Sequence, residues 1–266
     1  MNKPLQNKTI VITRGVEQSE SSLNIFGNLG ANVILFPTIK IINPVSFELF
    51  DEAVKNFNNF NYLIFTSVNS VNKFSERISD LNILLDFTNI KVVATGSRTA
   101  KACLENNIKV DLIPVKYNAE NIIDNLKDEI KNKNVLVPCS AIAREELVSG
   151  LTSAGANVVK TVIYEVGIPD KDEIAEYISE LNRNSPDVFI FTSPSTFKNF
   201  LSILKIDNPE IYFRNTVIAA IGTTTESAIE SLNVNVNIVP EVFTIEALAE
   251  SVTDYFEKIN FTNQHG

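Results

Sequence analysis

The chain of 266 residues is long enough for one large domain or two ordinary ones. Hydrophobic residues make up 44% of it and charged residues 21%, with only 9 glycines and 10 prolines, which excludes disordered, collagen-like and membrane-spanning proteins. The formal net charge of −9, without a local basic patch, excludes a nucleic-acid partner because the mean field of the protein repels a polyanion.

Short apolar runs flanked by turn residues predict strands along the whole chain. Several are apolar at successive positions, as in strands that helices cover on both faces. Apolar residues at helical spacing lie between them, and Gly30 and Gly155 follow two of these segments where a helix C-cap glycine belongs. The alternation predicts doubly wound parallel sheets with right-handed crossovers. The predicted strands are 9–13, 32–36, 62–65, 91–95, 110–113, 134–137, 157–164, 187–191, 216–221 and 236–239, and the predicted helices are 22–29, 119–131, 141–154, 172–181 and 245–256.

Four blocks of sequence recur at nearly one displacement. The segment 65–67 (FTS) returns at 191–193, which is 126 positions later (191 − 65). Further matches at the same or nearly the same displacement join 94–99 to 220–225, Pro114 to Pro240, and 30–33 (GANV) to 155–158. Because the blocks recur in the same order at nearly the same spacing, the sequence predicts two copies of a domain. A period this long is not that of a solenoid. The chain is therefore expected to hold two similar α/β halves.

In each half, Ser, Thr and Gly residues cluster directly after an apolar strand and before a helical stretch. This is the carboxyl edge of a parallel sheet, where helix N–H groups and hydroxyl groups bind anions. For a single Ser or Thr a plain helix cap is favoured by about two to one, but the repetition favours an anion site for the clusters. For each candidate arginine, a solvated surface charge is at least as good an explanation as a role in binding an anion. The candidate donors are Thr66, Ser67, Gly96, Ser97, Thr99, Ser140, Ser193, Ser195, Gly222, Thr224 and Thr225, and the candidate cations are Arg14, Arg98 and Arg144.

Rare residue types narrow the chemistry. The single histidine, His265, lies in the polar tail 260–266, where chains commonly fray, so a Ser-His-Asp triad or a histidine metal site is excluded. Cys103 and Cys139 lack C-x-x-C spacing and indicate reduced thiols, and we interpret Cys139 as a buried filler rather than a nucleophile. No apolar stretch fits a signal peptide or a membrane helix. We expect a cytoplasmic protein without a metal.

Several blocks carry a resemblance to a known family over nearly the whole chain, from about Ile10 to Ala249. They are 64–67 (IFTS), 95–96 with Thr99, 137–140 (VPCS) leading to 144–145, 162–164 (VIY), 191–195 (FTSPS) and 220–225 (AIGTTT). Their order and spacing resemble those of uroporphyrinogen-III synthase. The resemblance implies a cofactor-free lyase of tetrapyrrole and heme biosynthesis, which closes hydroxymethylbilane into uroporphyrinogen III with loss of water and inversion of ring D. We expect a monomer.

The same resemblance implies two α/β domains joined by a two-stranded linker, with the active site in the cleft between them. One domain would combine residues 1–36 with 168–266, and the other would be 44–160. The linker strands would be 37–43 and 161–167. Periodicity in the sequence does not by itself distinguish such interleaved domains from sequential ones.

Tyr164 matches the family's tyrosine at a strand end, whose proposed role is to assist departure of the hydroxyl group. A phenol stays protonated at neutral pH and donates a hydrogen bond to a leaving oxygen. The resemblance thus implies catalysis by positioning with modest acid assistance. The competing interpretation is an aromatic side chain that only packs on a linker strand, and we favour the catalytic role by about three to two because a buried tyrosine needs a hydroxyl partner in either case.

Two other functions stay open at the level of sequence. A two-lobed cytoplasmic binding protein would close on a small anionic ligand without catalysis. A transferase that uses a nucleotide sugar is disfavoured, because no catalytic carboxylate pair or phosphate loop is visible and Gly96 and Gly222 lack G-x-G-x-x-G spacing. The isomer formed from hydroxymethylbilane distinguishes the synthase from both.

Overall fold

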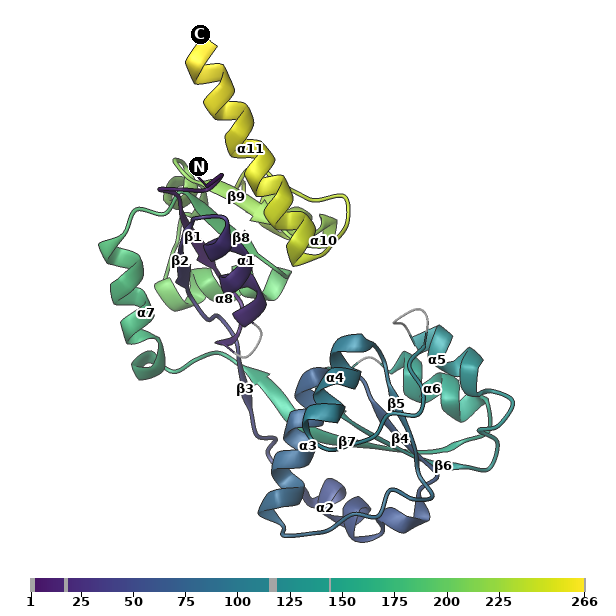
Figure 1. The fold of residues 1–266 in the computed structure, drawn as a ribbon. Helices are drawn as coiled ribbons and strands as arrows, with labels where there is room; N and C mark the ends of the chain where they lie inside the picture. Colours follow the sequence, from purple (N-terminus) through teal and green to yellow (C-terminus); the bar gives the residue numbers. More distant parts are fainter. Residues whose placement is uncertain (1–2, 17–18, 115–118, 144, 266) are drawn as a thin grey trace. The chain divides into compact units, whose positions relative to one another are not determined.

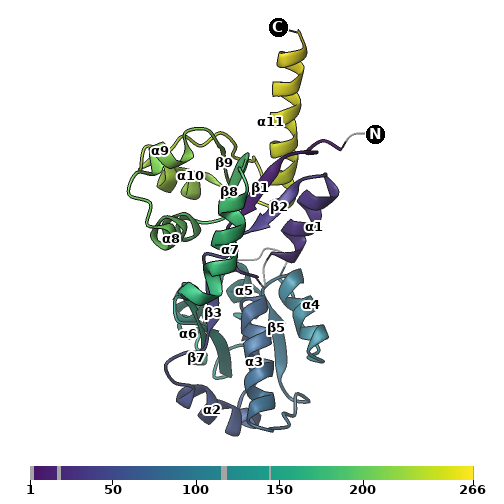
Figure 2. The same cartoon turned by 90° about the vertical axis from the view of Figure 1, so that its left-hand side faces the viewer.

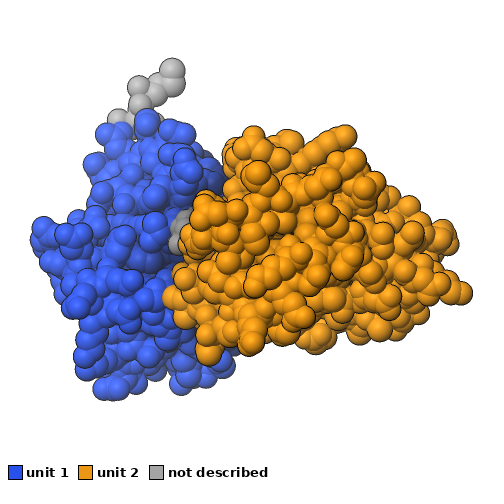
Figure 3. Space-filling model, turned by 90° about the horizontal axis from the view of Figure 1, so that it is seen from below, with its two compact units in different colours: residues 1–40, 167–266 blue, residues 41–166 orange. Residues whose placement is uncertain are grey.

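The computed structural model describes residues 3–16, 19–114, 119–143 and 145–265. The chain divides into two units (Figure 3): unit 1 comprises Met1–Lys40 and Gly167–Gly266, and unit 2 comprises Ile41–Val166. Unit 1 is therefore assembled from both ends of the chain, with unit 2 inserted between them. No helix in the described ranges is long and apolar enough to cross a membrane.

Unit 1 is built on a four-stranded parallel sheet in the order β2-β1-β8-β9. Its strands are β1 (Thr9–Ile12), β2 (Asn32–Leu35), β8 (Val188–Phe191) and β9 (Val217–Ala220), and its helices are α1 (Glu20–Asn28), α7 (Lys171–Arg183), α8 (Pro194–Leu204), α9 (Pro209–Phe213), α10 (Thr223–Glu230) and α11 (Ile245–His265). Successive strand residues face opposite sides. Val11 and Phe189 pack with α7 to α10, whereas Ile10 and Ile12 pack with α1 and α11 on the other face (Figure 2).

Unit 2 is built on a five-stranded sheet in the order β3-β7-β6-β4-β5, in which β7, β6, β4 and β5 run parallel. Its strands are β3 (Lys40–Ile42), β4 (Tyr62–Phe65), β5 (Lys91–Ala94), β6 (Asn134–Ser140) and β7 (Asn157–Gly167), and its helices are α2 (Glu48–Lys55), α3 (Val68–Asp80), α4 (Ser97–Glu105), α5 (Ala119–Leu126) and α6 (Glu146–Ser153). Leu63 and Phe65 pack with α2, α3 and α4 on one face, and Ile64 packs with α5 and α6 on the other. The expected α/β architecture with helices on both faces of parallel sheets is confirmed (Figure 1).

Two predicted strands, 110–113 and 236–239, are wrong. Each segment makes one isolated parallel bridge, Val93 with Leu112 and Ala219 with Ile238, because a side chain takes the place of the ladder. The carboxylate of Asp111 and the amide oxygen of Asn237 each accept a backbone N–H of the neighbouring strand at 2.8 Å. Both segments then end at a proline, which has no N–H to donate. The two donors are Val92 and Ile218, and the prolines are Pro114 and Pro240.

Three predicted helices differ from the structure by more than two residues at one end, whereas those predicted over 22–29 and 172–181 agree with α1 and α7 to within two. The helix predicted over 141–154 begins only at Glu146, because β6 continues to Ser140 and a turn follows. The helix predicted over 119–131 ends at Leu126. The last helix continues beyond the predicted residue 256 to His265, so the tail expected to fray is helical. The C-cap positions are confirmed, since Gly30 and Gly155 have φ angles of +95° and +91°.

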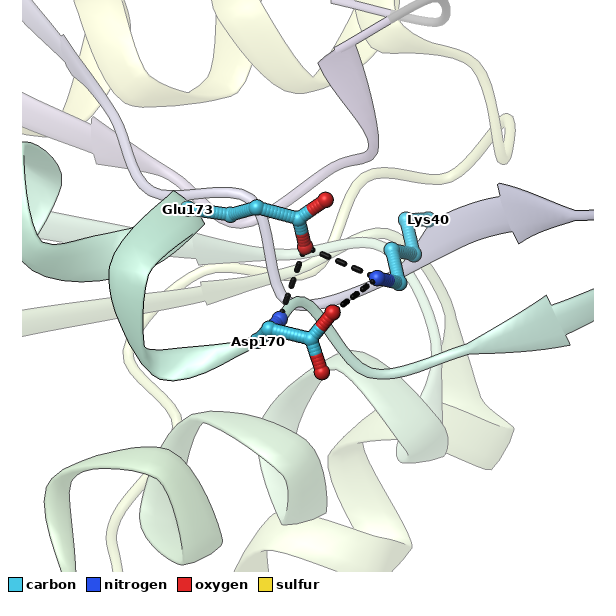
Figure 4. Close-up of polar contacts among 3 residues, drawn as sticks. All are labelled: Lys40, Asp170 and Glu173. Carbon is cyan, nitrogen blue, oxygen red and sulfur yellow. Dashed lines mark hydrogen bonds and ion pairs between the residues drawn. The ribbon is translucent and has the colours of Figure 1, made fainter.

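A charged cluster ties the start of α7 to β3, near the residues where the chain passes between the units (Figure 4). Lys40 Nζ lies 2.7 Å from Asp170 Oδ2 and 2.8 Å from Glu173 Oε2. Asp170 is also the N-cap of α7, and its N–H donates to Glu173 Oε2 at 2.7 Å. One lysine thus joins both acidic residues of a helix cap.

Replacing Lys40 with Met is expected to lower the melting temperature slightly at neutral pH and not at acid pH. The hydrogen bond from Lys40 lowers the pKa of Glu173 from 4.5, and hydrogen bonds to Asp170 and Glu173 raise the pKa of Lys40 from 10.5. The contribution of Glu173 to folding stability is therefore complete above pH 4.5 and is lost as the pH falls through the lowered pKa of the folded state. The contribution of Lys40 to folding stability is complete below pH 10.5 and is lost as the pH rises through its raised pKa. Thermal unfolding of both proteins across this range measures the difference.

The exposed pair Lys101–Glu105, with Nζ 3.6 Å from Oε1, offers the matched control. Lys101→Met is expected to shift the melting temperature less, because a pair exposed to solvent on both sides contributes little. If Lys40→Met lowers the melting temperature by the same amount at acid pH, the effect does not come from the ion pair with Glu173.

Candidate active site

A cavity of about 390 Å³ opens in unit 2 at the carboxyl ends of its central strands. Thr66 and Ser67 follow β4, Thr95 follows β5, and Ser140 ends β6, so hydroxyl groups from three neighbouring strands meet at one edge. Ligands of parallel α/β sheets bind at this edge. The rest of the lining consists of Ala119, Ile122, Val137, Cys139, Ala143, Glu146, Leu147, Val148, Lys160 and Tyr164.

Tyr164 reaches its position through an irregularity in β7. Cys139 of β6 pairs with Val162, but the next residue, Ser140, pairs with Tyr164, so Ile163 is an extra residue in β7. Such a bulge breaks the alternation of side chains along a strand. Ile163 and Tyr164 consequently lie in the same apolar cluster, on the side of the sheet that α3 covers. The tyrosine side chain is 7% exposed and borders the cavity.

The hydroxyl group of Tyr164 lies 3.0 Å from Ser67 Oγ. Ser67 is the N-cap of α3: its Oγ accepts the N–H of Ser70 at 3.0 Å, and Ser70 Oγ accepts the N–H of Ser67 at 3.2 Å. The positive end of the helix dipole favours negative charge at this point. The tyrosine–serine pair therefore lies where a developing negative charge is stabilised.

Unit 1 repeats this cap with a different partner. Ser193 caps α8 through the same reciprocal pair of hydrogen bonds, here with Thr196, both at 3.2 Å. Its Oγ lies 2.9 Å from Ser195 Oγ, so a second serine stands where unit 2 has a tyrosine. The two halves share the helix start and differ in the hydroxyl group beside it, which belongs to a tyrosine in unit 2 and to a serine in unit 1.

The other predicted site residues lie at the sheet edge of their own units. In unit 2, Gly96 is the N-cap of α4 and Ser97 its first residue, and in unit 1 Gly222 is the N-cap of α10 and Thr224 its second residue. Thr99 and Thr225 are buried, 6% and 3% exposed, and are the predicted donors least suited to contact a ligand. Their burial favours a role in packing the first helical turn.

The candidate arginines differ in their surroundings. Arg14 lies two residues after the end of β1 and is half-buried, so it lies at the carboxyl edge of the unit 1 sheet. Arg98 is exposed on α4. Arg144 lies outside the described residues. Of the two candidate arginines that the structure describes, Arg14 is thus the better placed.

Both cysteines are buried thiols. Burial raises the pKa of Cys103 and that of Cys139 to about 11. Because the thiolate is the nucleophile, neither side chain is activated. Cys139 nevertheless borders the cavity, where it acts as a small apolar wall. Within the described ranges no three His, Cys, Asp or Glu side chains gather to hold a metal.

Sequence reasoning missed two charged residues that line the cavity, Lys160 and Glu146. Lys160 interrupts the apolar run of β7, which is the one signal in the sequence that pointed to it. Its ion-pair partner, Glu145, comes from the turn before α6, and no periodicity predicts that contact.

Replacing Ser67 with Ala is expected to lower both stability and kcat. The free energy of unfolding falls by about 0.5–2 kcal/mol because α3 loses its N-cap. The variant also removes the partner of Tyr164, which lowers kcat by roughly fivefold for a neutral hydrogen bond of about 1 kcal/mol. Ser193→Ala is the matched control: it removes the equivalent cap but no tyrosine contact. We expect it to change KM with kcat maintained. Equal losses of kcat in both variants would assign the effect to the caps alone.

Comparisons with known proteins place these features in one family. The family model described as "Uroporphyrinogen-III synthase HemD" matches residues 23–250. The uroporphyrinogen-III synthase of Synechococcus elongatus is 28% identical over 261 residues, covering 95% of this chain and 97% of that protein. The enzyme of the same name from Chlorobaculum parvum is 27% identical over 250 residues, covering 93% and 98%.

Two solved structures share the fold. The uroporphyrinogen-III synthetase of Helicobacter pylori aligns with a TM-score of 0.64 at 20% identity, covering 93% of this chain and 99% of that one. A mutant uroporphyrinogen III synthase of Thermus thermophilus aligns with a TM-score of 0.56 at 16% identity, covering 94% and 99%.

Proposed function

The chain belongs to the uroporphyrinogen-III synthase family, and from this premise we propose that it closes hydroxymethylbilane into uroporphyrinogen III, with loss of water and inversion of ring D. The match over residues 23–250 favours this enzyme over a two-lobed binding protein without catalysis. The structural observation that supports it most is the Tyr164–Ser67 pair, 3.0 Å apart, beside a cavity lined by hydroxyl groups.

The pair is suited to assist departure of the hydroxyl group as water. Ser67 Oγ accepts a backbone N–H, so its own proton is free to point to the oxygen of Tyr164. The proton of Tyr164 then points to the leaving oxygen. As the tyrosine gives up this proton, the hydrogen bond from Ser67 and the dipole of α3 stabilise the phenolate that develops. The acid assistance is modest, so positioning of the flexible substrate supplies the rest of the rate.

A protein with a net charge of −9 must receive a polycarboxylate. We propose that neutral donors do this locally: the hydroxyl groups of Thr66 and Ser140 in unit 2, and the starts of α4 and α10 with their N–H groups. Such donors bind carboxylates without the desolvation cost of buried lysines and arginines. Ser193 and Ser195 are proposed to do the same in unit 1, where Arg14 would add one charged donor.

The test is the isomer ratio formed from freshly prepared hydroxymethylbilane. The enzyme is expected to yield the inverted isomer, uroporphyrinogen III, in excess over the product of spontaneous closure. If only the uninverted isomer appears, the proposed function is wrong. Light scattering at the assay concentration tests the proposal that the enzyme is a monomer, and cell fractionation tests its proposed cytoplasmic location.

A further inference from the structure

Lys160 lies on β7, four residues before Tyr164, and its side chain lines the same cavity. Among the described residues that form this lining, it is the one cation. The acidic side chain of Glu146 also lines the cavity and is exposed. An anionic group that enters therefore meets one repelling carboxylate and one lysine that offsets it.

The present partner of Lys160 is a weak one. Its Nζ forms an ion pair with Glu145 and lies 3.5 Å from the carbonyl oxygen of Ala143. The side chain of Glu145 is 71% exposed, whereas that of Lys160 is 20% exposed. A carboxylate so open to solvent gains little from the pair, because water competes for it. Glu145 is not among the described residues that line the cavity.

We propose that Lys160 exchanges Glu145 for a carboxylate of the substrate, and so holds one acid side chain of the linear tetrapyrrole in the unit 2 cavity. This inference rests on the proposed function. The volume of about 390 Å³ is near the lower end of the range for small-molecule pockets, about 300–1,000 Å³, and suits one pyrrole ring with its acid chains. The apolar wall from α5 and α6 contacts the ring, and Lys160 binds its carboxylate.

The exchange has a direct consequence for the reaction. A ring held by Lys160 lies in the cavity that Tyr164 borders, so the lysine fixes which part of the flexible substrate the tyrosine meets. Lys160 is thus a binding residue whose loss raises KM more than it lowers kcat.

The experiment compares Lys160→Met, Lys160→Arg and Glu145→Gln in the full chain, with hydroxymethylbilane as the probe. Loss of a charge-assisted hydrogen bond is expected to raise KM about 10- to 100-fold in Lys160→Met, and Lys160→Arg is expected to recover most of it. Glu145→Gln is expected to leave KM unchanged or lower it, because it removes the competing carboxylate. Circular dichroism checks that each variant is folded.

The outcomes separate the inference from the function it rests on. If the wild type makes uroporphyrinogen III and Lys160→Met keeps its KM, the inference is wrong while the function stands. If Glu145→Gln raises KM as much as Lys160→Met, the pair is structural and the inference is also wrong. If Lys160→Met does not fold, a raised KM in Glu145→Gln still overturns the proposal, and a lowered KM supports it. A wild type that makes only the uninverted isomer contradicts the function itself.

Discussion

Replacing Tyr164 with Phe is expected to lower kcat about ten- to a thousandfold, toward the lower end of the roughly hundred- to ten-thousandfold contribution of one acid–base group, because a phenol is a weak acid. The variant keeps the ring that packs beside Ile163 in the apolar cluster of unit 2 and removes the hydroxyl group that lies 3.0 Å from Ser67 Oγ. Departure of water is then expected to lack the proton donor that we propose, while the cavity keeps its shape. The measurement is the initial rate of uroporphyrinogen III formation, corrected for spontaneous closure of hydroxymethylbilane.

Tyr62 provides the matched control. It is a buried tyrosine of the same sheet, 5% exposed, but it begins β4 at the opposite end of the strand from the cavity. Tyr62→Phe removes a hydroxyl group that interacts with Glu129, so we expect a change in stability and an unchanged kcat. An unchanged kcat in Tyr164→Phe would remove Tyr164 from the acid role. Equal losses in both variants would point to packing instead.

The sequence predicted the parts of the fold that depend on local pattern. The strands were visible because helices cover both faces of each sheet, which makes successive residues such as Ile10, Val11 and Ile12 apolar. The repeat then showed that Ser67 and Ser193 occupy equivalent helix starts, and the structure confirms both as N-caps.

The features that the sequence could not predict depend on contacts between distant segments. The run 162–164 is apolar throughout, so no periodicity reveals that Ile163 is an extra residue in the ladder with β6. The segments 110–113 and 236–239 have the composition of strands, but a side chain of each takes the hydrogen bond that a ladder would use. Thr99 and Thr225 stand in a cluster of predicted donors, but the structure buries both side chains.

Replacing Phe200 with Ala is expected to lower the free energy of unfolding of unit 1 by about 3–5 kcal/mol and to leave that of unit 2 unchanged. Phe200 is fully buried in unit 1, with its ring centroid 4.9 Å from that of Phe36 and 5.4 Å from that of Phe189. Phe36 comes from the first segment of the chain and Phe189 from the last, so Phe200 joins the two segments that form this unit. Calorimetry of the full chain is expected to show two transitions, of which Phe200→Ala lowers one.

The reciprocal variant completes this test. Phe74 is 1% exposed in unit 2, with its ring 5.6 Å from Phe50 and 5.2 Å from Phe65, and Phe74→Ala is expected to lower the other transition by a similar amount. Because the two sites share no packing partner, their effects should add in the double variant. We propose that residues 1–36 with 168–266 and residues 44–160 are separate domains joined by 37–43 and 161–167. Two independent transitions would support this proposal. One transition that both variants lower equally would mean that the chain unfolds as a single cooperative unit, and the division into domains would then describe its shape and not its stability.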